Sequence, residues 1–375
     1  FYLWTKEQVL GLLGPEAGQR FALYYGIEDE GNAFVDPQHE FAGKNILHIA
    51  EDLAALSRTV RKPEPELAAE LERSRNTLLL ARSKRPRPLK DDKILTAWNG
   101  LLIGALARSG WVLASPSYVD AARQTARFLL HSLHDPSTGR LYRRYRDGEA
   151  RFDAHLEDYS FFVHGLLNLF ETTGEGNWLD EATGLTKTMV SLFLDQAHGG
   201  FFETTGEDGS VIARMKEHYD GAEPSGNSVA AMNLLRLTAL TGDPSWRAHA
   251  ERTLAAFEPI LEKQPVVMPH MVSALERLMT PSMEIVLVGP TGDEKTEALV
   301  HEVRSRYLPN AAVIRVDTNP GAVPQRTFAA SYPLVEGQPA AYVCEDFTCK
   351  LPATKPSDLA DILGENSLIA RPPAR

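Results

Sequence analysis

Carboxylates and aromatic rings gather directly before an apolar segment in the stretch "DDKILTAWNGLLIGALA". The polar half of this stretch offers Asp92, Trp98 and Asn99. A carboxylate moves protons or bonds hydroxyl groups, and an indole ring stacks on the apolar face of a sugar. The structural alternative is that Asp92 caps the following helix and that Trp98 packs between helices. The residue types are therefore compatible with a sugar site, a helix cap or both.

A second cluster, "HLEDYS", precedes the next apolar segment. Glu157 and Asp158 are adjacent and cannot share one helix face, but near a helix start one can cap while the other points inward. The alternative is the favourable placement of acids at a helix N-terminus. The resulting prediction is that Asp92, His155, Glu157 and Asp158 are catalytic and that Tyr159 binds substrate with Trp98 and Asn99.

The third cluster is "HYDGAEPSGNS", again before an apolar segment. It adds Asp220, Glu223, Ser225 and Asn227 as candidate substrate-binding residues, although plain loop and cap chemistry would use the same residue types. One residue is enough to cap a helix, so three clusters with several polar groups each exceed that need. Two carboxylates that face one another would permit acid/base chemistry on a glycosidic bond or a sugar carbon.

The elements that position these clusters repeat along the chain. Helix pairs align on Tyr118, Trp178 and Trp246, and each pair joins an apolar inner helix to a more polar outer helix. A helix that is apolar nearly all round must be buried. The pattern predicts an α/α toroid over residues 45–280, after an irregular opening segment at 1–44. In such a ring, the loops that lead into the inner helices converge on one mouth.

The periodicity changes after Pro281. A buried strand at Met283–Gly289, a helix, and a second strand at Ala311–Val316 predict a small parallel α/β unit over residues 282–365. "AAYVCEDFTC" would add a third strand, and "SDLADILGEN" a closing helix. The expected fold class is therefore mainly α, a partial (α/α)6-toroid-like set of helical hairpins followed by a small α/β subdomain.

Composition excludes several classes of function. A net charge of −11 argues against nucleic-acid binding, and no apolar run reaches the roughly 20 residues of a membrane helix. Without H-E-x-x-H or paired C-x-x-C motifs, we expect no metal and no cofactor. The two cysteines, Cys344 and Cys349, are too few for a disulfide framework and fit a cytoplasmic protein. A turn between them would allow a redox pair, and the alternative is two buried, inert thiols.

Several motifs together resemble the YyaL-type family, thioredoxin-domain-containing proteins that are bacterial relatives of the spermatogenesis-associated proteins. The motifs are "FYLWTKEQV", "GKNILH", "RPRPLKDDKILTAWNG", "HLEDYSFF", "DGAEPSGNSVAAMNLLRLT" and "YVCEDFTCKLP". The resemblance implies a toroid like that of six-hairpin glycosidases and N-acylglucosamine 2-epimerases. It also implies a thioredoxin-like domain as partner, which this chain lacks. Because the chain opens at Phe1 without methionine, we expect it to be part of a larger protein.

These observations predict a carbohydrate-active protein, either a sugar isomerase/epimerase or a glycoside-processing enzyme, with an acidic, aromatic-lined cavity at the inner-helix starts. The alternative is a redox-linked protein-interaction module that works with the thioredoxin-like domain through Cys344 and Cys349 and performs no sugar chemistry. An accessible acidic mouth would favour the first hypothesis. A plugged mouth with exposed cysteines would favour the second.

Overall fold

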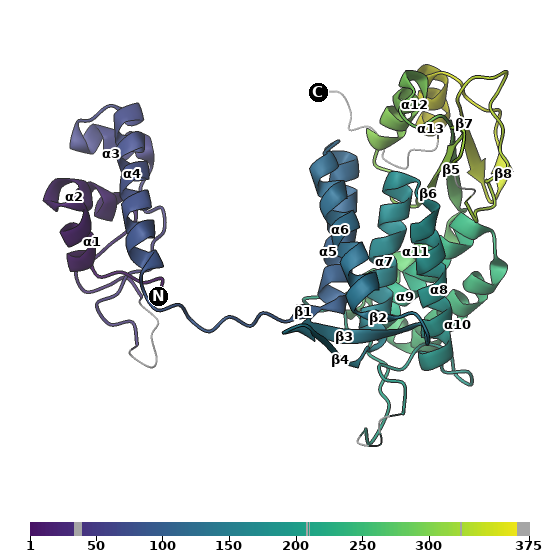
Figure 1. Ribbon diagram of the computed structural model, residues 1–375, viewed down its shortest axis with the longest axis horizontal. Coiled ribbons are helices and arrows are strands. Elements are labelled where there is room, and N and C mark those ends of the chain that lie inside the picture. The colour runs from purple at the N-terminus through teal and green to yellow at the C-terminus, as the bar shows by residue number, and fades with distance from the viewer. Residues whose placement is uncertain (34–39, 208, 210, 323–324, 366–375) are drawn as a thin grey trace. The chain divides into compact units, whose positions relative to one another are not determined.

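The computed structural model describes residues 1–33, 40–207, 209, 211–322 and 325–365, and its chain divides into two compact units at residues 91 and 92 (Figure 1). The helices between residues 53 and 83 lie in the smaller unit, whereas the sequence-based boundary at residue 45 placed them in the toroid. The physical reason is that Leu56, Leu67 and Leu78 share one apolar cluster with Val9 and Phe21.

The smaller unit contains four described helices. Thr5 begins the first one by accepting a hydrogen bond from the Gln8 amide. Gly14, with φ of 79°, then separates this helix from the next one. Leu67 and Leu78 are buried on the last helix. The bounds are α1 Lys6–Leu13, α2 Pro15–Tyr24, α3 Leu53–Val60 and α4 Glu64–Ser83.

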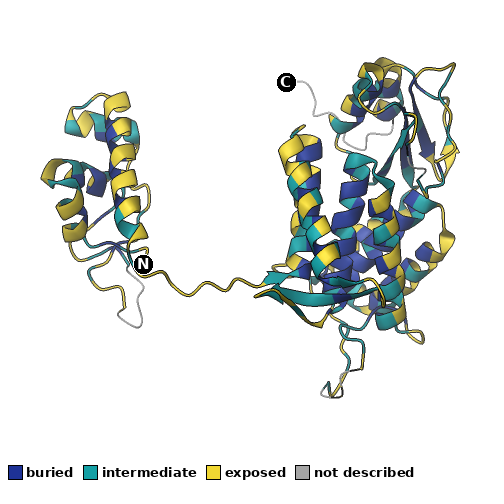
Figure 2. Ribbon diagram, viewed as in Figure 1, coloured by how far each residue is buried: buried dark blue, intermediate teal, exposed yellow. Residues whose placement is uncertain are grey.

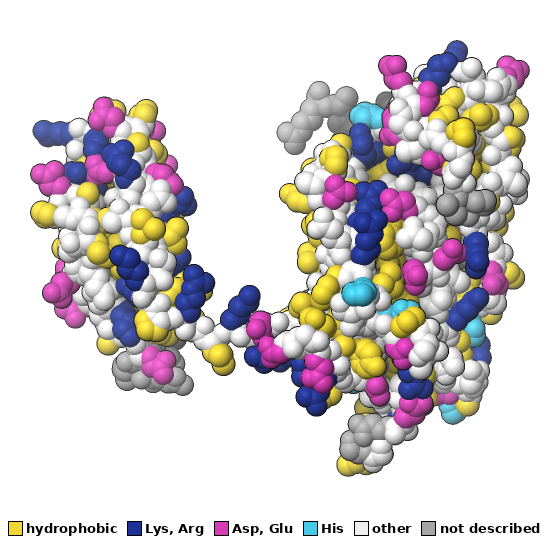
Figure 3. Space-filling view, in the orientation of Figure 1, with side chains coloured by type: hydrophobic (Ala, Val, Ile, Leu, Met, Phe, Trp, Pro, Cys, Tyr) yellow, Lys and Arg dark blue, Asp and Glu magenta, His cyan; other side chains and the backbone are white. Residues whose placement is uncertain are grey.

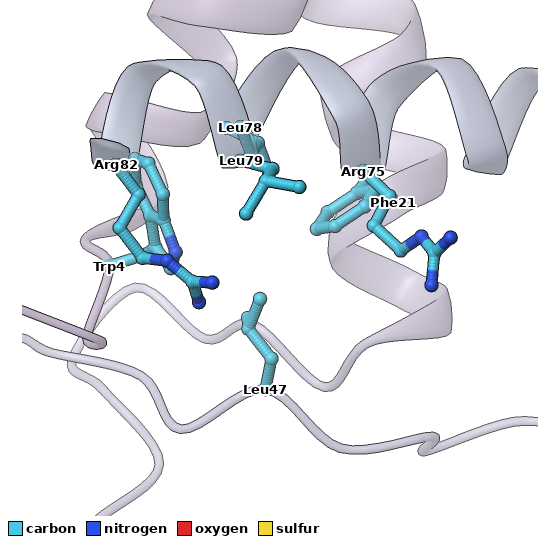
Figure 4. A pocket seen from close by; sticks show the side chains of 7 residues that line it. All are labelled: Trp4, Phe21, Leu47, Arg75, Leu78, Leu79 and Arg82. Atoms are coloured by element: carbon cyan, nitrogen blue, oxygen red, sulfur yellow. The ribbon is translucent and has the colours of Figure 1, made fainter. Parts of the chain in front are cut away.

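A hollow of about 380 Å³ opens beside α4 in this unit (Figure 4). Its wall is mostly apolar, and Arg75 and Arg82 supply the charged groups. Arg75 is already paired with Glu72 at 2.7 Å. Because the described lining includes no carboxylate, this hollow offers no acid/base pair. The lining residues are Trp4, Phe21, Leu47, Arg75, Leu78, Leu79 and Arg82.

The larger unit carries the predicted helix pairs, and its inner helices are largely buried, as Figure 2 shows for α7 and α9. The apolar sequence of these two helices explains that burial. The inner helices are α5 Thr96–Val112, α7 Leu156–Thr173, α9 Gly226–Thr241 and α11 Pro269–Met279. The outer helices are α6 Pro116–Ser132, α8 Gly176–Phe193 and α10 Pro244–Lys263.

Two glycines allow α5 and α7 to touch backbone to backbone. A Cβ atom at Gly100 would lie 2.5 Å from the carbonyl carbon of Phe161, and one at Gly165 would lie 2.5 Å from the Gly100 carbonyl oxygen. Any side chain at these positions would push the helices apart. Glycine here therefore brings the polar start of α5 against the start of α7.

Short strands connect the helix pairs. Leu141 and Tyr142 lie in a strand, whereas Phe201 forms only an isolated bridge with Leu194 in the next repeat. In the first repeat, β3 also pairs with a further strand, β4. These strands are β1 Ile94–Leu95, β2 His134–Asp135, β3 Arg140–Arg146 and β4 Glu149–Asp153.

A four-stranded sheet follows the helix pairs. Its central strand β5 is parallel to β6 but antiparallel to β7, so the predicted all-parallel unit is corrected to a mixed sheet. β7 runs against β5 over Met283–Val288 and Ala340–Glu345, and a tight turn after β7 then adds β8 as a further antiparallel strand. The elements are β5 Met283–Gly289, α12 Glu294–Arg304, β6 Ala311–Asp317, β7 Ala340–Glu345, β8 Thr348–Cys349 and α13 Pro356–Glu365; Asn366, within the predicted closing helix, lies outside the described residues.

The side chains of β5 point alternately to the two faces of the sheet, and those on one face attach the sheet to the helices. Val286 and Val288 belong to the main helical core, whereas Ile285 and Leu287 pack with α12 and α13 in a separate cluster. Successive side chains of a strand point to opposite faces, so one strand serves both cores. The predicted fold class, partial helical hairpins followed by a small α/β subdomain, is confirmed. No described helix is long and apolar enough to cross a membrane.

Candidate functional site at the inner-helix starts

Asp158 joins the starts of α5 and α7. Its Oδ1 accepts a 3.0 Å hydrogen bond from the Ala97 amide, and its Oδ2 accepts one of 2.9 Å from the His155 amide. Only 1% of the residue is exposed, and burial raises its pKa to about 7 against the opposing effect of these donors. The carboxyl group is therefore a buried cap that fixes the geometry of the mouth.

Arg143, on β3, contacts both adjacent acids. Its Nη2 lies 2.8 Å from Glu157 Oε1, and its Nη1 lies 3.3 Å from Asp158 Oδ2. The Glu157 and Arg143 side chains are 26% and 34% exposed, so this ion pair is reached by solvent. The arrangement separates the two acids into a buried cap and a charged group at the surface of the mouth.

Glu203 is a carboxyl group near this ion pair and forms no ion pair of its own among the described residues. It is half-buried, and its Oε1 accepts a 3.3 Å hydrogen bond from the Glu217 amide. Burial, together with the charges of Glu157 and Glu217, raises its pKa to about 7. The main chain is fixed because the Leu156 amide donates to the Glu203 carbonyl at 3.1 Å. A partly protonated acid thus lies beside the start of α7.

His155 stands at the cap of α7 and is half-buried. Burial, followed by the nearby Arg143 charge, lowers its pKa from the usual value. The imidazole is therefore neutral at neutral pH and is able to accept or donate a proton.

Trp98 supplies an aromatic surface at the same helix starts. The residue is 62% exposed, and its Nε1–H donates a 3.0 Å hydrogen bond to Glu223 Oε2 in the loop before α9. Contact between Gly226 and Leu156 places the start of α9 against that of α7. The starts of α5, α7 and α9 thus contribute to one polar surface. The Trp98 indole on this surface is exposed to solvent.

Three other predicted residues do not join this group. Asp92 pairs with Arg146 at 2.8 Å. The Asn99 side chain donates to the Leu95 carbonyl at 2.8 Å. Tyr159, predicted to stack on a sugar, is 1% exposed, and its hydroxyl accepts a 2.8 Å hydrogen bond from the Leu141 amide. A stacking role for Tyr159 is corrected to a core role, because no face of its ring is accessible.

The remaining residues of the third cluster hold the chain. Asp220 accepts from the amides of Ser225 and His270, both at 2.8 Å. Ser225 caps α9 by accepting from the Ser228 amide at 3.1 Å. Asn227, fully buried, bonds the main chain of Phe201 in both directions. In the structure these three residues cap α9 and hold the loop before it, and substrate binding by them stays a prediction.

Sequence reasoning missed Arg143 and Glu203. They follow Leu141–Tyr142 and Phe201–Phe202, so they occupy equivalent positions in the two repeats. The available signal is the charged residue that directly follows the equivalent apolar or aromatic pair in each repeat.

Cys344 and Cys349 form a disulfide bond. They are cross-strand partners in the β7–β8 hairpin, and Asp346 and Phe347 turn the chain with positive φ angles. The expected turn is therefore present, and the alternative of two separate inert thiols does not describe this structure. Cys344 is buried, whereas Cys349 is partly exposed and lies 3.3 Å from the Tyr332 hydroxyl.

Among the described residues, no group of three or more His, Cys, Asp or Glu side chains is arranged to hold a metal ion. No family model matches the chain. Human spermatogenesis-associated protein 20 is 35% identical over 386 residues, which cover 97% of this chain and 49% of that protein. An uncharacterized protein of Caenorhabditis elegans is 30% identical and is covered to 52%. The chain thus spans about half the length of the curated relatives it matches.

Solved structures give a distant resemblance to sugar epimerases and glycoside hydrolases. A cellobiose 2-epimerase from Bacillus thermoamylovorans is 16% identical with a TM-score of 0.39, and the match covers 46% of each chain. A glycoside hydrolase family 76 mannosidase from Bacteroides thetaiotaomicron is 13% identical with a TM-score of 0.39, over 73% of this chain and 81% of that one. These partial matches concern the helical fold.

Proposed function

We propose that this chain, a homologue of spermatogenesis-associated protein 20 over about half of that protein's length, acts on carbohydrate by carboxylate acid/base chemistry at the inner-helix starts. Glycoside processing is the form that the local geometry supports best, with sugar isomerisation or epimerisation as the related alternative. Glu203 is the general acid in this proposal, Glu157 is the partner carboxylate, and Trp98 is the stacking surface.

The observation that carries the proposal is the different environment of two neighbouring carboxyl groups. Glu157 is held by Arg143 at 2.8 Å, whereas Glu203 lacks an ion pair among the described residues and has a pKa raised to about 7. Glycoside cleavage needs one protonated acid for the leaving oxygen and one ionised carboxylate. Arg143 contacts Glu157, and Asp158 caps the start of α7, so both residues help to position this pair.

Trp98 adds a reason to choose sugar as the substrate class. Sugars present apolar C–H faces that stack on indole rings and hydroxyl groups that bond carboxylates. An indole that is 62% exposed and bonded to the Glu223 carboxylate supplies both kinds of contact. A protein-binding role alone gives no reason for a protonatable acid at this point.

Thermal melting of the chain with a panel of mono- and oligosaccharides tests this proposal. We expect a saturable increase in melting temperature with at least one sugar, lost in Trp98→Ala and weakened in Glu203→Gln. Glu262→Gln, at an exposed position on α10, is the matched control and should behave like wild type. No stabilisation by any sugar, or equal stabilisation of all variants, would argue against the site.

A second candidate function rests on the Cys344–Cys349 disulfide. In this alternative, a dithiol of a thioredoxin-like domain reduces it. One thiolate attacks Cys349 Sγ, the more accessible sulfur, and Cys344 leaves as a thiolate that takes up a proton. The second thiol of the partner then displaces Cys349, so the partner becomes the disulfide and both cysteines here become thiols.

Mixing the oxidised chain with a reduced C-x-x-C protein tests this alternative. Two new thiols per chain, and a trapped mixed disulfide with a partner variant that lacks its second cysteine, would support redox exchange. If the disulfide survives a large excess of the reduced partner, this function is excluded.

A further inference from the structure

A second group of polar side chains lies on the inner helices, away from the helix starts. His164, Asn168 and Glu171 on α7 are spaced at three and four residues and so share one face of that helix. Arg236 on α9 contacts all three, and α11 adds basic groups nearby. On the face of the larger unit drawn in Figure 3, basic and His side chains lie among acidic and hydrophobic ones. We call this group the inner strip; its members are His164, Asn168, Glu171, Arg236, His270 and Arg277.

Arg236 is at the centre of the inner strip. Its Nη2 forms a 2.5 Å ion pair with Glu171 Oε2 and donates a 3.2 Å hydrogen bond to Asn168 Oδ1. Its Nη1 lies 3.5 Å from His164 Nδ1, and only 8% of the side chain is exposed. Glu171 therefore neutralises the charge of Arg236.

The contact between α5 and α7 leaves room for the inner strip. A Cβ atom at Gly104 of α5 would lie 2.9 Å from Asn168 Nδ2 and 3.0 Å from His164 Cδ2. Glycine thus leaves room for two polar side chains where a larger residue would fill the space. Burying a polar group without a hydrogen-bond partner costs free energy, so any member of the strip that lacks one calls for a role other than packing.

Arg277 and His270 form no ion pair among the described residues, although nearby carboxylates favour their charged forms: Glu171, Glu284 and Glu276 for Arg277, and Asp220 for His270. Arg277 Nη2 and His270 Nε2 are buried and have no hydrogen-bond partner among the described residues. Burial lowers the pKa of Arg277 to about 10, so its guanidinium stays charged at neutral pH. The nearby Glu284 already accepts from Ser282 and from the Phe347 amide, and burial raises its pKa. The inner strip therefore carries one positive charge with no fixed partner.

We propose that the inner strip binds the anionic group, a carboxylate or a phosphate, of a sugar ligand. Arg277 is its main cationic contact, Arg236 lies behind it, and His270 Nε2–H donates a hydrogen bond. A carboxylate or phosphate gains short, charge-assisted hydrogen bonds from guanidinium groups. The inference rests on the proposed function for the sugar part of the ligand, and it names the substrate class as an acidic sugar or a sugar phosphate.

Binding to the intact chain with Arg277→Met tests this inference. The probes are glucuronate, glucose 6-phosphate, neutral glucose and inorganic phosphate, followed by calorimetry. We expect at least one anionic probe to bind more tightly than glucose, and its affinity to fall at least tenfold in Arg277→Met. Arg247→Met, which removes an exposed arginine paired with Glu251, is the control and should bind like wild type.

The melting temperature of Arg277→Met without ligand separates a binding role from a structural one. Removing an unpartnered buried charge should leave the melting temperature unchanged or raise it, whereas loss of a structural arginine would lower it. A variant that melts lower and binds every probe as before overturns the inference.

The remaining outcomes separate this inference from the proposed function. Tighter binding of glucuronate than of glucose 6-phosphate assigns the site to carboxylates, and the reverse order assigns it to phosphates. If inorganic phosphate binds through Arg277 but no sugar binds, the anion site stands and the sugar function fails. If glucose binds as well as the charged sugars in wild type and variant, the anion site is overturned and the sugar function stands. If none of the probes binds, the anion site is overturned.

Discussion

The Trp98 indole N–H donates a 3.0 Å hydrogen bond to Glu223, and this bond links the first turn of α5 to the loop before α9. Between these two starts lies that of α7, which touches both neighbours through Gly100, Gly165 and Gly226. The polar surface at the helix starts is thus a product of close helix packing, and its chemistry depends on residues far apart in the sequence.

Trp98→Ala should reduce sugar binding about tenfold, because stacking of the sugar on the indole ring and the bond to Glu223 are both lost. Stability should change by only about 0.5 kcal/mol, since the side chain is 62% exposed. Urea unfolding together with a sugar titration measures both effects. A large loss of stability with unchanged binding would show that Trp98 is structural.

Glu203→Gln should change how stability depends on pH. Burial raises the pKa of Glu203 from its ordinary 4.5 to about 7, so the folded chain holds this proton more tightly than the unfolded chain. The stability that the group contributes is full below about pH 4.5 and is lost as the pH rises through about 7. Glu203→Gln escapes this loss. The difference in unfolding free energy between the variant and wild type should therefore shift by about 1–2 kcal/mol in favour of the variant between about pH 5 and about pH 8.

Urea unfolding of both proteins at the two pH values measures this difference. Glu262→Gln, exposed on α10, should follow wild type at both. Parallel curves for wild type and Glu203→Gln would mean that the carboxyl group titrates normally and is not suited to be the acid.

Asp158→Ala should destabilise the larger unit by about 2–4 kcal/mol, because the Ala97 and His155 amides and Arg143 would lose a buried partner. Asp120→Ala removes an exposed acid that is also paired with an arginine, and should cost at most about 1 kcal/mol. Denaturant unfolding of the two variants gives the comparison. Equal small losses would contradict the capping role.

Gly100→Ala should cost about 3 kcal/mol or more, since its Cβ would lie 2.5 Å from the backbone of Phe161. Gly184→Ala on α8 is the matched control, because no atom lies within 4 Å of its added Cβ. That variant should gain about 0.5–1 kcal/mol from helix propensity. Thermal unfolding of both variants checks the expected opposite signs.

Much of the fold was accessible from the sequence, because apolar periodicity and the spacing of Tyr118, Trp178 and Trp246 record the helix pairs directly. The mixed sheet was missed, since the sequence of β7 does not encode the direction in which it pairs with β5. That direction is set by tertiary packing, in which Ala341 and Val343 of β7 join the cluster formed with α12 and α13.

The place of the candidate site was also predictable, but the roles within it were not. Glu157 and Asp158 are adjacent acids, and only the approach of Ala97 to Asp158 makes one of them a buried cap. Arg143 and Glu203 come to the mouth from hairpins, through contacts that no local pattern specifies. Tyr159 was assigned to the surface because its neighbours are polar, yet its position on α7 faces the core.

The most direct test of the central claim is product release from a panel of oligosaccharides, followed by chromatography, with wild type, Glu203→Gln and Glu262→Gln in parallel. The account predicts turnover by wild type and by Glu262→Gln, and a loss of at least a hundredfold in Glu203→Gln, the scale of a general acid. Turnover that is unchanged in Glu203→Gln, or a complete lack of turnover by wild type across the panel, would contradict it.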